Sequence, residues 1–415
     1  MDACVELPAM RRSEEMPGLA QRFCWVAAIF IVAPAMVLCT RAANHVVAWG
    51  AGTILQPSDG NDFGQSIVPA SLTNAVFVSG GWRHSLALRS TGVLKGWGDD
   101  TLGQTDLAPS GTNTCLGIAC GYLHSLALRT NGTVVAAGDD SFGQTEVPAG
   151  LSNVVAIAAG FYHGLALKTD GTVVAWGGRN NVAIVDHGQG RTPAGLTNVV
   201  AIAAGGYHNL ALRSDGTLFA WGLNDSGQTN IPAGLNDVLE IAAGAAHNLV
   251  LRADGTALSW GLNNHSQTNI PPGLSNVVAV VAGGWHCLAL KSDGTVVAWG
   301  AGLGSNPDVD FEQNVVPAGL TNVIQIAAGT LHSLVLVGDS PPLSGASFTS
   351  PNLGPNGFSV SVPAQSGRVY RLEFKNALSQ TNWNALPLRA GVSGDLQFND
   401  PGVASQQKFY RVRRW

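Results

Sequence analysis

The segment VVAIAAGGYHNLALRSDGTLFAWG, residues 199–222, decides the fold of this chain. It begins with a short apolar run, Val199 to Gly205, whose β-branched residues predict a buried strand. Two further apolar runs, 210–212 and 218–221, flank the pair Asp215-Gly216. This pair predicts a hairpin, because glycine supplies the positive φ that the turn needs. The segment therefore predicts three consecutive antiparallel strands.

Seven copies of this segment fill most of the 415 residues. We expect each copy to add a fourth, outer strand, as around Gln228-Thr229 before Pro232, because proline suits a sheet edge. Four short strands in a repeat of about 40 residues are typical of a propeller blade. A Gly-x-x-His element marks every copy, at His84, His124, His163, His208, His247, His286 and His332. A Trp-Gly element marks six copies, at Trp49, Trp97, Trp176, Trp221, Trp260 and Trp299, and Ala137 takes the remaining slot.

The first and last copies are cut in complementary places. The first Trp-Gly has no Gly-x-x-His before it, and the Gly-x-x-His of His332 has no Trp-Gly after it. A ring that pairs the two chain ends explains both, since closure protects the edges of the end strands. The sequence predicts an all-β fold, a seven-bladed β-propeller closed by N- and C-terminal strands, in which Val46 to Trp49 completes the blade of His332.

The propeller is expected to span residues 44–340. Residues 1–43 predict a secretory signal peptide, because basic residues precede an apolar run, Phe23 to Cys39, and small residues follow it. An uncleaved membrane anchor is the alternative, since this run is at the short end of a spanning helix. Residues 341–415 contain segments in which apolar and polar residues alternate, as they do in strands. This segment predicts a small immunoglobulin-like β-sandwich, similar to C-terminal modules of many secreted bacterial proteins. We expect a secreted or cell-envelope protein that meets a membrane only through a retained signal.

Composition excludes several kinds of function. Charged residues make up 12% of the chain, the formal net charge is -5, and no basic cluster lies in the repeats, which argues against nucleic-acid binding. Cys115, Cys120 and Cys287 are expected to be small buried hydrophobic residues without a disulfide. The acidic loop Asp308-x-Asp310-x-Glu312 lacks the spacing of a calcium loop and is interpreted as solvated. We find no catalytic constellation and expect no metal or cofactor.

The repeated histidines and tryptophans have a structural interpretation. One histidine per copy predicts one buried hydrogen bond per blade, because a buried polar group needs a partner. The Trp-Gly tryptophans are expected to pack between blades. Three connectors after Trp-Gly are long, at 51–71, 178–195 and 301–319, and the four compact ones share a glutamine followed by threonine. Insertions at one point of a repeat are expected to rim one surface of the ring.

The two variable residues inside Gly-x-x-His are the candidate binding residues. They vary while their neighbours repeat, so blade packing does not fix them. Six of them are aromatic, at Trp82, Tyr122, Phe161, Tyr162, Tyr207 and Trp285. One interpretation is that these rings cover the axial channel. The other is an aromatic binding face, since tryptophan and tyrosine anchor protein interfaces.

The repeat, with Val-Val-Ala-Ile-Ala-Ala-Gly-x-x-His, Asp-Gly-Thr-Val-x-Ala-Trp-Gly and Gly-Gln-Thr-x-x-Pro, resembles the regulator of chromosome condensation repeat family. Its eukaryotic founders are nuclear exchange factors for a small GTPase, with longer repeats. The short blades and the signal are closer to secreted bacterial type II β-lactamase inhibitor proteins, which bind an enzyme through one propeller face. A plant ultraviolet-B photoreceptor is also similar, but its Gly-Trp-Arg-His motif occurs here once, at 81–84, which argues against a photosensor.

The resemblance adds two candidates and frames the functional hypothesis. In the inhibitor relatives the residue after Trp-Gly lies on the binding face, and Asp99 and Asp139 match that slot here. We expect a non-enzymatic secreted scaffold that binds an unidentified protein partner through an aromatic arc on one propeller face. The alternatives are a propeller that binds or cleaves carbohydrate and an intracellular regulator resembling a GTPase exchange factor.

Overall fold

The structure is a computed structural model that describes residues 4–6, 44–53, 55–56, 61–107, 114–179, 186–301, 309–339, 348–354, 357–376, 380, 383–392, 394–401 and 408–415. All regular secondary structure in these residues is β-strand, as the all-β prediction requires. The described part of the chain holds no helix long and apolar enough to cross a membrane. Of the predicted signal segment, only strand β1 (Cys4–Glu6) lies within the described residues.

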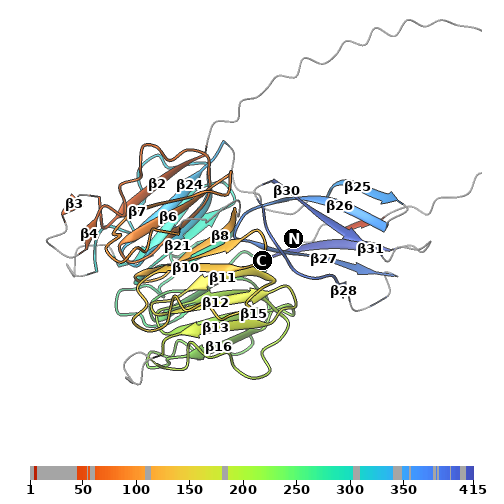
Figure 1. Cartoon of the computed structure of the whole chain (residues 1–415), viewed down its shortest axis with the longest axis horizontal. Coiled ribbons are helices and arrows are strands. Elements are labelled where there is room, and N and C mark those ends of the chain that lie inside the picture. The colour runs from red at the N-terminus through yellow and green to blue at the C-terminus, as the bar shows by residue number, and fades with distance from the viewer. Residues whose placement is uncertain are drawn as a thin grey trace, which may run out of the picture.

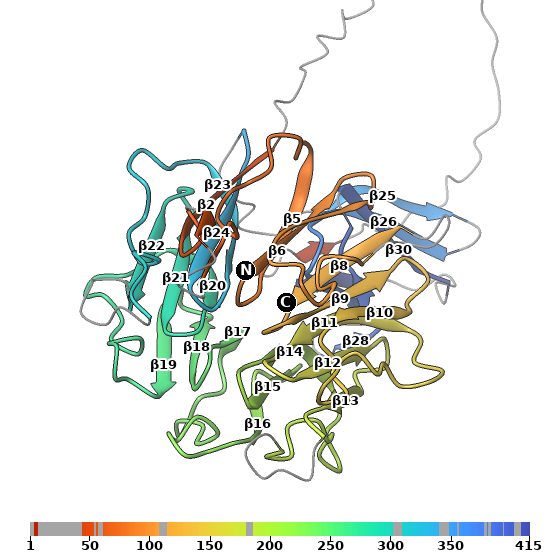
Figure 2. The same cartoon turned by 60° about the vertical axis from the view of Figure 1, so that its left-hand side comes forward.

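Seven three-stranded sheets, counted over the described residues, stand around a common axis (Figures 1 and 2). We number them as units 1 to 7 by their histidines, from His84 to His332. The units are β5 (Ala75–Gly80), β6 (His84–Arg89) and β7 (Leu94–Gly98); β8 (Cys115–Cys120), β9 (His124–Arg129) and β10 (Val134–Gly138); β11 (Val154–Ala159), β12 (His163–Lys168) and β13 (Val173–Gly177); β14 (Val199–Ala204), β15 (His208–Arg213) and β16 (Leu218–Gly222); β17 (Val238–Ala243), β18 (His247–Arg252) and β19 (Ala257–Gly261); β20 (Val277–Ala282), β21 (His286–Lys291) and β22 (Val296–Gly300); and β23 (Val323–Ala328), β24 (His332–Val337) and β2 (His45–Gly50).

Each unit is an antiparallel meander whose first strand lines the axis. In unit 4, Val199 lies opposite Arg213, and the predicted hairpin joins β15 to β16 with Gly216 at φ 87°. The predicted fourth strand is wrong, because no strand follows β16 in this unit. The segment after Gln228 bonds to its own loop instead, where Thr229 N–H donates to Asn224 Oδ1 at 2.9 Å. A turn therefore takes the place of a ladder at the outer edge.

The two ends of the repeat region meet in unit 7. Strand β2 pairs antiparallel with β24, with His45 opposite Val337 and Gly50 opposite His332, which is the pairing that the split repeat predicts. The Trp49 indole N–H donates to the carbonyl of Gln313 at 3.0 Å. Thr330 N–H donates to Gly81 O of unit 1 at 2.9 Å, so the last unit also bonds to the first complete one.

A β-sandwich follows the repeats, as the sequence predicts. One sheet holds β25 (Thr349–Gly354), β26 (Gly357–Ala364) and β30 (Gly394–Asp400), and the other holds β27 (Val369–Lys375), β31 (Phe409–Arg414), β28 (Asn384–Ala385), β29 (Arg389–Ala390) and β1. Phe358, Val362, Tyr370, Phe398 and Tyr410 form part of its buried core. The predicted boundary at residues 340 and 341 lies outside the described residues.

The sandwich packs against the ring face that carries the β-hairpin turns (Figure 1). Leu388 N–H donates to Thr169 O at 3.2 Å, and the Arg413 guanidinium donates to Ser214 O at 2.8 Å. Both acceptors belong to hairpin turns, of units 3 and 4. Arg368 forms a largely buried ion pair with Glu240, which lines the axial channel. One face of the ring is thus occupied by the protein's own C-terminal domain.

Candidate binding face

The seven repeat histidines are all fully buried and hold neighbouring units together. In six of them Nε2 bonds the residue that follows the next unit's histidine; the partners are Ser125, Asn209, Asn248, Cys287, Ser333 and Ser85, at 2.7 to 3.2 Å. Asn209 Nδ2 donates to Gln189 O at 3.0 Å, so its Oδ1 faces His163 and this histidine must donate from Nε2. The prediction of one structural bond per blade is confirmed for six units.

The exception is His124 in unit 2. The residue after the next histidine is Gly164, which has no side chain to offer, and neither ring nitrogen of His124 has a partner among the described residues. A Cβ at Gly164 would collide with the Trp176 indole, which is 1% exposed and fills that space. The boundary between units 2 and 3 therefore exchanges a hydrogen bond for tryptophan packing.

Burial keeps these histidines neutral. It lowers the pKa of His84, His163 and His208 to about 4, and that of His124 to about 3, where the neighbouring His163 and His84 lower it further. A buried imidazole loses hydration when it is charged, so it titrates below its usual range. Such groups serve as structural hydrogen-bond donors at neutral pH, in line with their predicted role.

The tryptophans bridge units through a second buried group. Each indole N–H donates to the main-chain carbonyl of a glutamine in the preceding unit, as Trp97 does to Gln65 at 2.8 Å and Trp221 to Gln189 at 3.3 Å. The glutamine side chain accepts the N–H two residues before it, so it fixes its own loop. Seven buried glutamines fill this position: Gln65, Gln104, Gln144, Gln189, Gln228, Gln267 and Gln313.

The sequence interpretation recognised this glutamine only in the four compact connectors. The long connectors also return to it, at Gln65, Gln189 and Gln313. The residue before the glutamine adopts positive φ, as Gly188 does at 81° and Glu312 at 59°. A residue that favours positive φ is therefore the sequence signal that could have found these glutamines. A glycine before a glutamine marks two of the three, and Glu312 departs from that pattern.

The ring face opposite the sandwich carries a continuous aromatic cluster. We call Trp82, Tyr122, Phe161, Tyr162 and Tyr207, which come from units 1 to 4, the aromatic platform. The ring centroids of Trp82 and Tyr122 are 4.0 Å apart, those of Tyr122 and Phe161 4.9 Å, and those of Tyr162 and Tyr207 5.8 Å. Phe142 and His187 extend it, packing edge-on against Tyr162 and Tyr207. All five side chains of the platform are half-buried.

One end of the platform is a three-layer stack. The rings of Trp82 and Tyr122 are nearly parallel, with 7° between their planes. The Arg83 guanidinium lies 3.3 Å from the Trp82 centroid, and 4.8 Å from that of Phe63. A ring that contacts a parallel ring and a guanidinium at such short distances has both faces covered. Trp82 therefore presents an edge to solvent.

The tyrosine hydroxyls of the platform are protonated at neutral pH. Burial raises the pKa of Tyr122 to about 12, and burial together with nearby Tyr207 and Tyr122 raises the pKa of Tyr162 further. The platform thus offers neutral hydroxyl donors beside apolar rings, a combination that protein interfaces favour.

The remaining candidates lie apart from the platform or have structural partners. Trp285, in unit 6, makes no ring contact with any other described aromatic residue. Asp99 is 4% exposed, and its carboxylate accepts the N–H of Thr101 at 3.0 Å. Asp139 is half-buried and accepts hydrogen bonds from Ser141 and Gln144. Both carboxylates therefore fix the turns that follow Trp-Gly or Ala-Gly.

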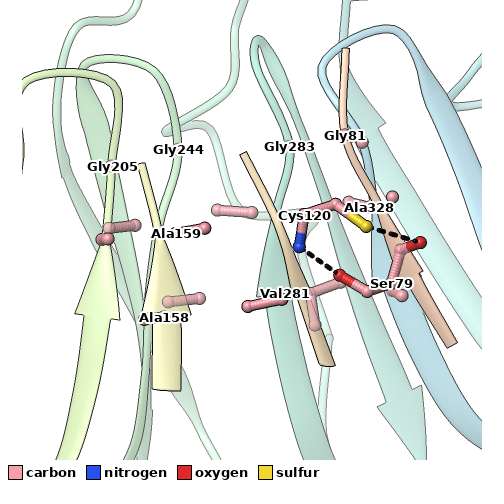
Figure 3. A pocket seen from close by; sticks show the side chains of 18 of the residues that line it. Ser79, Gly81, Cys120, Ala158, Ala159, Gly205, Gly244, Val281, Gly283 and Ala328 are labelled. Atoms are coloured by element: carbon pink, nitrogen blue, oxygen red, sulfur yellow. Dashed lines mark hydrogen bonds between the residues drawn. The ribbon is translucent and has the colours of Figure 1, made fainter. Parts of the chain in front are cut away.

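The axial channel is a cavity of ≈ 310 Å³ lined mainly by small residues (Figure 3). Cys120 N–H donates to Ser79 Oγ at 3.0 Å, and its thiol donates to Ser79 O at 3.5 Å. Cys115, Cys120 and Cys287 form no disulfide, and Cys115 and Cys287 are buried as predicted. Of the six aromatic candidates, Phe161 alone is among the described residues that line the cavity. Channel covering therefore does not account for the rest of the platform.

Metal chemistry finds no support in the described residues, where no three His, Cys, Asp or Glu side chains are placed to bind an ion. Asp308 of the acidic loop lies outside them. The channel likewise gathers no histidine or paired carboxylates around a nucleophile.

Comparisons with known proteins bear on the repeats. Residues 75–104, 117–144, 154–189, 199–228, 238–267 and 277–303 match the regulator of chromosome condensation (RCC1) repeat. No curated protein matches the chain. Prp20p of Saccharomyces cerevisiae has a similar fold, with a TM-score of 0.58, 22% identity, and coverage of 72% of this chain and 92% of that one.

Two further solved structures agree with that fold. The same yeast protein in a complex with Kap60 gives a TM-score of 0.55 at 21% identity, covering 80% of this chain and 97% of that one. Human WBSCR16 gives 0.52 at 20% identity, covering 72% and 99%. At these identities the similarity shows the β-propeller fold alone. Together with the repeats matched over residues 75–303, it shows that the chain belongs to the family of proteins built from regulator of chromosome condensation repeats.

Proposed function

We propose that this protein is a non-enzymatic scaffold that binds a protein partner through the aromatic platform. The observation that carries the proposal is the placement of the platform. Five aromatic side chains from four units contact one another on one ring face, while the C-terminal sandwich occupies the other. Contiguous half-buried aromatic groups are the usual anchors of protein interfaces.

The geometry of Trp82 favours a protein over a carbohydrate. Sugar stacking requires an open aromatic face, whereas Tyr122 and Arg83 cover both faces of this ring. The other platform rings are tilted against each other by 45° or more. A tilted, interlocked set of rings offers edges and hydroxyls to an irregular protein surface. A carbohydrate ligand remains the alternative outcome of the test.

An extracytoplasmic partner is part of the proposal, supported by the predicted signal segment 1–43. Sequencing the N-terminus of the native protein tests it, and we expect a start near Ala43 or Asn44. The structure of Prp20p was reported with its binding properties to Gsp1p and histones, so an exchange-factor-like role inside the cell is the competing proposal. An intact Met1 on cytoplasmic protein would favour that alternative.

Affinity capture from extracellular extract, run beside a glycan array, tests the platform. We expect Trp82→Ala, Tyr162→Ala and Tyr207→Ala each to weaken binding of the captured protein by about 2 kcal/mol, which raises Kd roughly 30-fold. The reason is that each substitution removes an interfacial aromatic anchor. Trp285→Ala is the matched control, since Trp285 lies directly before its histidine, as Tyr162 and Tyr207 do, and is outside the platform.

Three results would count against the proposal. Binding that survives all three platform substitutions would place the site on another surface. Equal losses of affinity in Trp285→Ala and Tyr162→Ala would mean that the partner contacts the whole ring face and that binding does not depend on the platform in particular. Glycan binding that is lost in Tyr162→Ala would assign the platform to carbohydrate.

A further inference from the structure

Units 1 and 2 differ from units 4 and 5 in the charge of one loop. The loop after Trp-Gly or Ala-Gly has the same length in all four units, at 99–106, 139–146, 223–230 and 262–269. The first two loops carry three acidic residues each and no lysine or arginine. The loops of units 4 and 5 carry one acidic residue, Asp225, and none. The negative charge therefore gathers on the units that hold Trp82 and Tyr122.

The turn itself does not need this charge. Asp100 Oδ1 accepts Thr105 N–H at 2.8 Å, and Asp140 Oδ1 accepts Thr145 N–H at 2.9 Å. The same bond in unit 4 is accepted by the amide oxygen of Asn224, at 2.9 Å. An asparagine makes the same turn as an aspartate, so folding does not explain the carboxylates.

The charge also removes a stabilising bond. In unit 4, Asn224 Nδ2 donates to Asn230 Oδ1 at 2.9 Å, and unit 5 makes the same bond between Asn263 and Asn269. The corresponding pairs are Asp100 with Asp106 in unit 1 and Asp140 with Glu146 in unit 2. Two ionised carboxylates are acceptors only, and they repel each other. Units 1 and 2 thus replace a hydrogen-bonded amide pair with a pair of like charges.

These loops border the aromatic platform. Asp99 N–H donates to Arg83 O at 2.8 Å, and Asp139 N–H donates to Leu123 O at 2.9 Å, so each loop starts beside a Gly-x-x-His element. Phe142, within the second loop, packs against Tyr162 at 4.8 Å. Asp139 is close enough to raise the pKa of Tyr162. Aromatic rings and carboxylates therefore share one surface over units 1 to 3.

We propose that the partner presents a lysine- or arginine-rich segment to this part of the platform. The inference rests on the proposed function and names the chemistry of the partner. Cationic side chains are attracted to aromatic rings and to carboxylates alike, and complementary charge speeds encounter and selects partners. A basic protein segment satisfies both the rings and the like-charge pairs, which an acidic or wholly apolar segment does not.

Selection of a random peptide library displayed on phage, against the folded full chain, tests the inference. We expect the selected peptides to be enriched in lysine and arginine. The best peptide, made synthetically, should bind about tenfold more weakly to the quadruple variant Asp100→Asn, Asp106→Asn, Asp140→Asn and Glu146→Gln at low salt. This difference should shrink at high salt, because salt screens exposed charges. Asp225→Asn in unit 4 is the matched control and should bind as the unchanged protein does.

The outcomes separate the inference from the proposed function. Peptides that lack basic residues, or that bind the quadruple variant with equal affinity, yet lose binding in Tyr162→Ala, would overturn the basic partner and leave the platform standing. Peptides whose binding is unchanged by Tyr162→Ala would overturn both. So would a selection that enriches no peptide relative to the variant that combines Trp82→Ala, Tyr162→Ala and Tyr207→Ala. Circular dichroism on each variant checks that the turns survive, as the asparagine turns of units 4 and 5 lead us to expect.

Discussion

Units 1 to 3 and units 4 to 6 have the same backbone fold. They differ in the contacts between neighbouring units and in the side chains on the face opposite the sandwich. At the boundary of units 4 and 5, His208 bonds Asn248 at 2.8 Å, and Gly206 N–H donates to Ala245 O at 3.1 Å. At the boundary of units 2 and 3, His124 has no partner, and the described residues show no main-chain bond from Tyr122 to Phe161. The aromatic rings of Tyr122, Phe161 and Tyr162 meet there instead.

This difference teaches that the repeat tolerates losses of buried hydrogen bonds in the units that carry the aromatic platform. The second loss lies at Ala137, which cannot donate to the carbonyl of Gln104 as the six tryptophans do elsewhere. Both losses fall under the platform and beside the acidic loops. Aromatic contacts across the boundaries replace part of the missing buried hydrogen bonding.

Lowering the pH should change the free energy of unfolding more than any substitution below, and it should destabilise units 1 to 3 and units 4 to 6 alike. The histidines have folded pKa values of about 3 to 4, below the usual 6.5, so the unfolded chain binds protons first. Stability is unaffected above pH 6.5 and falls as pH drops from 6.5 towards 4, by about 2 kcal/mol per histidine at pH 5. Seven histidines together give a loss on the order of 10 kcal/mol.

Urea unfolding between pH 4 and 8, followed by tryptophan fluorescence, measures this loss. The C-terminal sandwich is an internal control, because residues 341–415 contain no histidine. Stability that is flat down to pH 4.5 would show that the histidines are hydrated or charged in the folded ring, contrary to their burial.

Removing an intact bond should give the next largest effect. Asn248→Ala deletes the acceptor of His208 and the donor to Gln228 O at 2.7 Å, both fully buried. We expect a loss of about 2 to 3 kcal/mol, because the buried Nε2–H of His208 is left without a partner and Gln228 O keeps only the indole N–H of Trp260. Such a variant makes the boundary of units 4 and 5 resemble that of units 2 and 3. Chemical denaturation measures the loss, with Asp225→Asn as a surface control, and a loss below 0.5 kcal/mol would mean that water replaces the amide.

Restoring a missing bond should give the smallest effect, with the opposite sign. Ala137→Trp places an indole N–H near the carbonyl of Gln104, as Trp97 does for Gln65. We expect a gain of about 1 kcal/mol from one hydrogen bond and added apolar burial. A thermal unfolding midpoint that rises confirms an empty slot. A midpoint that falls would show that the residues of unit 2 have packed into the space beside the alanine. The backbones of the two halves would then differ as well.

The regular features could be predicted because each has a local cause. Asp215-Gly216 predicts its hairpin from turn chemistry, and the period of Gly-x-x-His predicts the seven units. The fourth strand was predicted wrongly, since a proline suits both an edge strand and a loop. The choice depends on Asn224 and Gly227, which bond Thr229 and Asn230 within the loop. Side-chain capture of a backbone N–H carries no signal in hydrophobic periodicity.

Only part of the candidate site could be predicted from the sequence, for a similar reason. Variation inside Gly-x-x-His identified Trp82, Tyr162 and Tyr207, because a position that escapes the repeat is free of the repeat's packing. Nothing in the sequence separated them from Trp285, which also lies inside Gly-x-x-His but has no ring neighbours among the described residues. Phe142 and His187 escaped notice, since their loops fold towards Tyr162 and Tyr207 only in three dimensions.

The sequence by itself determined the number of units, the three paired strands within each unit and the buried histidine and tryptophan that recur in it. These features depend on short-range spacing, and seven copies repeat the same physical requirement. The tertiary structure alone decided which face the sandwich covers, where His124 lacks a partner and which aromatic rings touch. Those facts join residues about 40 or more positions apart, such as Arg368 with Glu240 and Tyr122 with Phe161. No local preference encodes such contacts, because they depend on how rigid units stack around the axis.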